Sequence, residues 1–126
     1  MATGFTMTEQ LHSHHWSAIL QASPTLKTWT ETQFLTALKT SVQTVGLTPI
    51  SQTGFTFAPH GVSVVVLLAE SHVALHYWPE KDKVTVDIHI CDYQQTNRLK
   101  AEQLTHLLTQ WLSETSGHWH RLSLTE

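Results

Sequence analysis

The sequence predicts an α+β fold, a two-layer α/β sandwich in which two helices lie on one face of a mainly antiparallel sheet. Extended and helical stretches follow one another in the order strand, helix, run of strands, helix, strand. The strands in the middle are separated by short turns, which favours hairpins and antiparallel pairing. The chain of 126 residues has the length of one domain, residues 1–126, and shows no internal boundary or repeat.

The first helix is predicted from apolar side chains that recur at helical spacing. Thr30 or Thr32 is suited to cap its start, and it runs to about Val45. Gly46 follows and is suited to end it in the left-handed conformation. The apolar positions are Phe34, Leu35, Leu38, Val42 and Val45.

The second helix is predicted to begin at Thr96 or Asn97 and to be ended by Gly117. Its apolar side chains form one stripe, which should face the sheet. They are Leu99, Leu104, Leu107, Leu108, Trp111 and Leu112. We expect Trp111 to lie in the core.

Extended stretches account for most of the remaining chain. They are residues 15–22, residues 47–57 with a break at Thr53-Gly54, and residues 62–70, 71–78, 84–91 and 118–125. Residues 62–70 are rich in β-branched side chains and predict a central strand. Residues 84–91 alternate, so Asp87, His89 and Cys91 share one face and the apolar side chains share the other. Residues 1–10 read as a loose leader.

Composition excludes several classes of function. Charged residues make up only 13% of the chain and the net charge is −3, without a basic stripe, so we expect no nucleic-acid partner. A weakly charged surface favours self-association. The chain start is unlike a signal peptide, and the longest apolar run, residues 62–69, is too short to cross a membrane. We therefore expect a cytoplasmic protein with no membrane partner.

Histidine is the unusual residue type, with ten copies. His12, His14 and His15 lie close together near the chain start, and we interpret them as solvated side chains and not as metal ligands. His118 and His120 are expected on the surface of the last strand. Asp87, His89 and Cys91 share a strand face but are too spread to close a metal site, so no metal is predicted.

One stretch of about a quarter of the chain carries an ordered set of motifs. They are Phe57, Pro59, Gly61-Val62-Ser63, Glu70-Ser71-His72, His76, Trp78-Pro79-Glu80, Asp87 and Cys91. The set resembles, in its pieces and in the gaps between them, the signature region of the small bacterial and archaeal S-adenosylmethionine decarboxylases. The flanking regions agree with that family in element order but hardly in residues.

The resemblance implies that the chain cuts itself between Glu70 and Ser71 into residues 1–70 and 71–126. The Ser71 hydroxyl would attack the Glu70 carbonyl and replace the amide by an ester. Elimination and hydrolysis would then turn Ser71 into a pyruvoyl group. Such a group can form a Schiff base with a substrate amine and accept the electrons that decarboxylation releases, which protein side chains cannot do.

The resemblance also implies roles for five further residues. Ser63 would support the tetrahedral intermediate of processing, and His76 would act in the elimination. Cys91 would return a proton to the substrate carbanion. Phe57 would stack on the adenine, and Glu80 would hold the ribose hydroxyls. The family further implies a homodimer of cut protomers with active sites near the subunit boundary.

Each of these residues also has a plain structural interpretation. Alone, Ser71 would be an ordinary serine at a strand end, Cys91 a buried thiol and His76 a core histidine. Phe57 and Trp78 would be core aromatics, and Glu80 would be solvated. Only the ordered set favours the functional interpretation.

The sequence departs from the family at Ile19, in a slot that is usually acidic, and at Val64, Tyr77 and Asp92. These departures leave open two alternatives to an active S-adenosylmethionine decarboxylase. One is a pyruvoyl-dependent decarboxylase of a basic amino acid, arginine or ornithine. The other is an unprocessed, inactive relative that regulates a partner.

Overall fold

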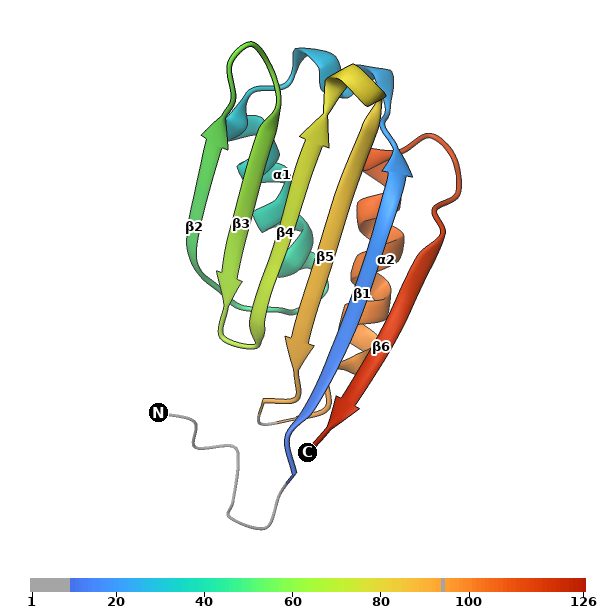
Figure 1. The fold of residues 1–126 in the computed structure, drawn as a ribbon. Coiled ribbons are helices and arrows are strands. Elements are labelled where there is room, and N and C mark those ends of the chain that lie inside the picture. The colour runs from blue at the N-terminus through green and yellow to red at the C-terminus, as the bar shows by residue number, and fades with distance from the viewer. Residues whose placement is uncertain (1–9, 94) are drawn as a thin grey trace.

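The computed structural model describes residues 10–93 and 95–126 of the chain (Figure 1). The strands are β1 (His12–Gln21), β2 (Pro49–Thr56), β3 (Val62–Leu68), β4 (Ser71–Trp78), β5 (Lys83–Cys91) and β6 (Trp119–Thr125). The helices are α1 (Glu31–Thr44) and α2 (Arg98–Leu112). Two short 3-10 helices occupy Pro24–Thr28 and Pro79–Lys81.

The strands form one sheet in the order β2-β3-β4-β5-β1-β6, and every neighbouring pair is antiparallel. Helix α1 packs against β2 and β3, and α2 packs against β1 and β5. Both helices lie on the same side of the sheet (Figure 1). The predicted two-layer α+β sandwich is confirmed. The opposite face carries no helix of the described residues, and we call it the open face.

The buried core lies between the sheet and the helices. Strands β3, β4 and β5 place alternate side chains there, and Phe34, Leu38, Leu104 and Leu108 fill the space from the helix side. Trp111 packs against this core as predicted. The alternating residues of β3 to β5 that face the helices are Val62, Val64, Val66, Leu68, Val73, Leu75, Tyr77, Val84, Val86, Ile88 and Ile90.

The helix ends follow local sequence signals, with two corrections. Thr30 caps α1 through a capping box with Gln33, and Gly46 follows with a φ of 89°. Helix α2, in contrast, ends at Leu112, and Gly117 lies in the following loop. Leu99 was predicted in the apolar stripe but is 65% exposed, because the buried side of α2 runs through Ala101, Leu104, Leu108 and Leu112, and Leu99 lies on the opposite side.

Two strand predictions also need correction. Strand β2 is unbroken at Thr53-Gly54, because both residues pair with β3. At Gly54 an added Cβ would lie 2.8 Å from the Glu31 side chain, so the glycine allows a close approach of helix α1 and marks no break. Strand β1 begins at His12, three residues earlier than predicted, because β5 and β6 both pair with its first half.

The solvated interpretation of the first histidines is therefore wrong for His14. Its side chain is buried, and its Nε2 atom lies 2.9 Å from Oδ1 of Asp92. His118 and His120 are exposed, as predicted. Neither helix of the described residues is both long and apolar enough to cross a membrane.

Candidate active site

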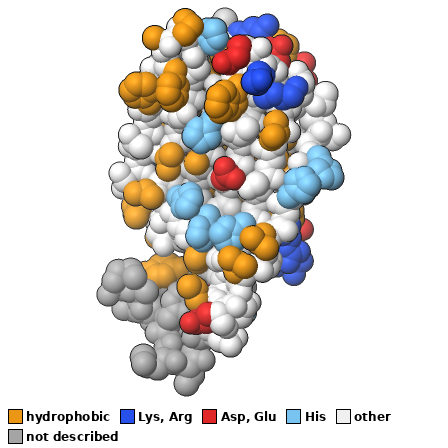
Figure 2. Space-filling model, in the orientation of Figure 1, with side chains coloured by type: hydrophobic (Ala, Val, Ile, Leu, Met, Phe, Trp, Pro, Cys, Tyr) orange, Lys and Arg blue, Asp and Glu red, His pale blue; other side chains and the backbone are white. Residues whose placement is uncertain are grey.

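The predicted functional residues lie on or beside the open face. Alternation along β3, β4 and β5 directs the small and polar side chains away from the helices. Figure 2, which views the molecule from the open side of the sheet, shows histidine side chains spread over this face with apolar side chains between them. The side chains on this face include Ser63, His72, His76, Asp87, His89 and Cys91; Asp87 is exposed and the other five are half-buried.

Glu70 and Ser71 lie at the tight turn that joins β3 to β4. Glu70 is only 7% exposed, and Thr48 donates to both of its carboxylate oxygens, from its amide and from its hydroxyl, each at 3.0 Å. The amide of Cys91 donates a hydrogen bond of 2.8 Å to the Glu70 carbonyl oxygen. That carbonyl is consequently fixed in place and polarised.

Ser71 has a φ of 137°, a conformation that L-residues rarely adopt. Such backbone strain occurs most often at functional sites. The Ser71 hydroxyl donates a hydrogen bond to the Cys91 sulfur at 3.2 Å. The structure thus brings together Glu70, Ser71 and Cys91, three residues to which the resemblance gave roles, and we call them the serine corner.

A row of imidazoles adjoins the serine corner and was not predicted. The Nε2 atom of His89 lies 3.6 Å from the Cys91 sulfur. The ring centroids of His15 and His89 are 4.1 Å apart, and those of His72 and His89 are 5.1 Å apart. Burial, and then the charges of His15 and His72, lower the pKa of His89 below its usual value. Alternation placed His89 beside Cys91, but the pairing of β1 with β5 could not be read from sequence.

A second group of predicted residues lies further along β3 and β4. Ser63 Oγ and His76 Nδ1 are 2.7 Å apart. Both line a pocket of about 510 Å³ that Phe57 and Glu80 also line. Phe57 is 47% exposed, so it is no core aromatic; Trp78, 43% exposed, lines the same pocket. We call this group the aromatic pocket.

The serine corner and the aromatic pocket do not meet within one chain. Ser71 begins β4 opposite Leu68, whereas His76 pairs with Ser63 five residues further along the strand. At about 3.3 Å per residue of strand, the two positions are roughly 16 Å apart. The predicted residues therefore form two sets, which lie at different positions along the β3–β4 hairpin.

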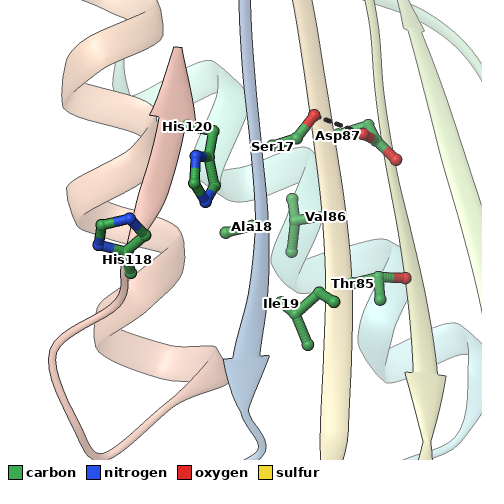
Figure 3. Close-up of a pocket in the computed structure, with 8 residues that line it drawn as sticks. All are labelled: Ser17, Ala18, Ile19, Thr85, Val86, Asp87, His118 and His120. Atoms are coloured by element: carbon green, nitrogen blue, oxygen red, sulfur yellow. Dashed lines mark hydrogen bonds between the residues drawn. The ribbon is translucent and has the colours of Figure 1, made fainter.

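The family departures at Ile19 and Tyr77 have different surroundings. Tyr77 is buried against Phe34 with ring centroids 5.5 Å apart, and burial, followed by the charge of Asp82, raises its pKa. Ile19 is 68% exposed and lines a hollow of about 350 Å³ on the open face (Figure 3). In the same hollow Ser17 donates to an Asp87 oxygen at 2.6 Å, so a carboxylate is still present beside the unusual isoleucine.

The fold and site define an α+β protein whose candidate active site is a strained serine beside a thiol, at a hairpin turn. The family model for S-adenosylmethionine decarboxylase matches residues 14–123, and the chain belongs to this family.

Relatives and one solved structure agree with this assignment. The chain is 48% identical over 54 residues to the S-adenosylmethionine decarboxylase proenzyme of Aquifex aeolicus, covering 43% of this chain and 40% of that protein. It is 34% identical over 85 residues to the proenzyme of Picrophilus torridus, covering 68% and 62%. The chain thus spans less than two thirds of the length of these relatives in sequence.

The structural similarity extends further. The crystal structure of the adenosylmethionine decarboxylase from Aquifex aeolicus is similar with a TM-score of 0.74 and 27% identity, over 91% of each chain. The α+β sandwich predicted from the order of strands and helices is therefore shared with a known member of the family beyond the region of clear sequence identity.

Proposed function

We propose that this protein is a self-processing, pyruvoyl-dependent S-adenosylmethionine decarboxylase that supplies decarboxylated S-adenosylmethionine for spermidine synthesis. The observation that carries the proposal is the serine corner. There a strained Ser71, hydrogen-bonded to the only cysteine of the chain, follows a carbonyl that the Cys91 amide polarises. The relatives that match this region are named as proenzymes, which supports a processing step.

Processing would begin with attack of the Ser71 hydroxyl on the Glu70 carbonyl carbon. Negative charge then develops on the carbonyl oxygen, which already accepts the Cys91 amide hydrogen. The Glu70–Ser71 C–N bond breaks as the ester forms. Loss of the Ser71 α-proton and of the main-chain carboxylate of Glu70 would leave residues 1–70 with a normal carboxyl end and a dehydroalanine at position 71. Water would then replace its nitrogen, which leaves as ammonia, so that residues 71–126 begin with a pyruvoyl group.

A pyruvoyl carbonyl at position 71 would supply the electron sink for decarboxylation. The residues around it fit such a group, because Ser71 begins β4 directly after the β3–β4 turn, where a new terminus can form, and its hydroxyl already contacts the thiol. Cys91 would hold the proton that replaces the lost carboxyl group. In the aromatic pocket, Phe57 would stack on the adenine and Glu80 would accept hydrogen bonds from the ribose hydroxyls.

The separation of the two residue sets supports a homodimer. In a two-fold dimer the same patch on each copy meets its partner. An axis crossing the open face between the serine corner and the aromatic pocket would bring the pocket of one copy to the corner of the other. Each active site would then combine Ser71 and Cys91 of one protomer with Ser63 and His76 of its partner.

The composition of the open face is suited to such an interface. Large apolar side chains are exposed there on both sides of the polar residues. Patches of this kind mark protein interaction sites in soluble proteins. Those on or beside the open face are Ile19, Phe55, Phe57, Leu67, Trp78, Leu122 and Leu124, each at least 43% exposed.

The test is release of labelled carbon dioxide from carboxyl-labelled S-adenosylmethionine, with arginine and ornithine as comparison substrates, after intact mass spectrometry has shown cleavage. We expect release from S-adenosylmethionine alone. Release from arginine or ornithine instead would show that the substrate is a basic amino acid. An uncut chain without activity would support the regulatory alternative. The family assignment favours neither alternative, and the cytoplasmic setting stays a prediction.

A further inference from the structure

Three strands each contribute one imidazole to the row beside Cys91. His89 comes from β5, His15 faces it from β1 and His72 faces it from β4. Hydrogen bonds connect Ser71 Oγ to Cys91 Sγ at 3.2 Å and Cys91 Sγ to His89 Nε2 at 3.6 Å. The His89 ring packs against the His15 ring with centroids 4.1 Å apart, and His15 Nε2 lies 2.9 Å from Ser13 Oγ.

Decarboxylation creates a demand for protons at this position. Each turnover replaces a carboxylate by hydrogen and therefore consumes one proton. If Cys91 gives its S–H proton to the substrate carbon, it is left as a thiolate and must regain a proton before the next turnover. A copy of the chain seated on the open face would shield the thiol from bulk water, so a route through side chains would be needed.

We propose that His89, packed between His15 and His72, is a positioning residue that acts through Cys91 and returns its proton. This inference rests on the proposed function. In the step, the Nε2–H bond of His89 breaks as the S–H bond of Cys91 forms, and Nδ1 of the same ring takes up one proton from solvent. The ring ends neutral as the Nδ1–H tautomer, and exchange of its ring protons with solvent restores the Nε2–H tautomer before the next turnover.

The surroundings of His89 suit this role. Its titratable neighbours on the open face are Asp87 and Cys91 on its own strand, His15 on β1 and His72 on β4. The helices lie on the other side of the sheet and contribute none. The lowered pKa of His89 keeps the ring neutral near pH 7, with one protonated and one bare nitrogen. A neutral imidazole can accept a proton on one nitrogen while it gives one from the other.

The first test measures the thiol without requiring catalysis. Because Cys91 is the only cysteine, alkylation by iodoacetamide reports this site alone. In the uncut Ser71→Ala chain, we expect His89→Phe to lower the alkylation rate at pH 7 at least threefold, because the phenyl ring offers no hydrogen bond to the thiolate. The matched control is His106→Phe on the exposed face of α2, which should leave the rate unchanged. Equal rates in all three chains would overturn the inference.

The second test uses the processed enzyme. His89→Phe and His89→Gln should each lower kcat about tenfold or more with KM within about twofold, and flatten the acidic limb of the kcat–pH profile. His89→Ala should regain activity on addition of free imidazole. Normal kcat in both substituted enzymes, without imidazole rescue, would refute the role of His89. Failure of the proposed function differs visibly, because the parent enzyme itself would then release no carbon dioxide.

Discussion

The amide of Cys91 donates a 2.8 Å hydrogen bond to the carbonyl oxygen of Glu70, the residue immediately before Ser71. This bond ties the end of β5 to the turn between β3 and β4. The sulfur of the same cysteine accepts a hydrogen bond from the Ser71 hydroxyl. Cys91 thus makes both contacts. Its backbone amide binds the carbonyl of the peptide bond that we expect to break, and its sulfur binds the hydroxyl of Ser71, the expected nucleophile.

Replacing Ser71 by Ala should leave one uncut chain of 126 residues. The substitution removes the nucleophile, while alanine meets the same backbone strain at a φ of 137°, so stability should change little. Intact mass spectrometry measures the outcome. Ser51→Ala, on the exposed side of β2, is the control and should still be cut. Two fragments from Ser71→Ala would show that the cleavage point is elsewhere.

Thr48→Val should destabilise the turn that carries Glu70. The change removes the hydroxyl that donates to the buried carboxylate at 3.0 Å but keeps the amide donor. A lost hydrogen bond to a charged group costs about 1.5 to 3 kcal/mol. Urea unfolding in the Ser71→Ala background measures this cost, and the cleavage rate of Thr48→Val itself should fall. Thr36→Val, exposed on α1, is the control; an equal cost for both would contradict the proposed role of the turn.

A mixed dimer tests whether the active site is shared. His76→Ala keeps Ser71 but lacks the imidazole expected in elimination, whereas Ser71→Ala keeps His76 but lacks the nucleophile. Expressed alone, neither should mature. Expressed together, the His76→Ala chain should be cut to completion in mixed dimers, which a tag on one chain would isolate. If it stays uncut there while size-exclusion chromatography shows a dimer, the shared site is wrong.

Acidification should destabilise the protein partly through His89. Its folded-state pKa lies below the unfolded value of about 6.5, so the unfolded chain binds this proton more readily. Stability should therefore fall as the pH drops from 7.5 through 6.5 toward the folded pKa of His89. Below that pKa, His89 should cause no further loss of stability. Urea unfolding of the uncut Ser71→Ala chain, with and without His89→Phe, at pH 7.5 and 5.5 isolates the effect. An equal pH dependence in both proteins would contradict it.

Two apolar substitutions should differ sharply in cost. Phe34 is fully buried and contacts Trp29 and Tyr77, so Phe34→Ala should lower the free energy of unfolding by about 3 to 5 kcal/mol. Leu99 is 65% exposed, and Leu99→Ala should change the free energy of unfolding by no more than about 0.5 kcal/mol. Urea unfolding of uncut chains compares them. A large cost at Leu99 would mean that a partner covers this side chain.

Local patterns predicted the parts of this fold that depend on neighbours in sequence. Thr30 and Gly46 bound the first helix as expected, and the alternation of residues 84–91 correctly separated Val86 from Asp87 and Cys91. The errors arose where distant segments decide. His14 is buried because β5 and β6 enclose the start of β1. Gly54 continues a strand because Glu31 from α1 needs the space.

The same distinction holds for the candidate site. The motif resemblance indicated Ser63, Ser71, His76 and Cys91, but spacing along a sequence gives no distance between them. The division of these residues into two sets follows from the β3–β4 register, which only the structure shows. The contact of His15 with His89 joins residues 74 positions apart, so it could not be foreseen from either segment alone.

The strand order has a consequence for the two chains that cleavage would produce. Residues 1–70 would keep β1, β2 and β3, and residues 71–126 would keep β4, β5 and β6. Because β1 lies between β5 and β6, and β3 pairs with β4, the fragments would be interlocked along three separate ladders. Cutting one peptide bond would free a new chain end without releasing either fragment, so maturation could proceed with the hydrophobic core never exposed to water.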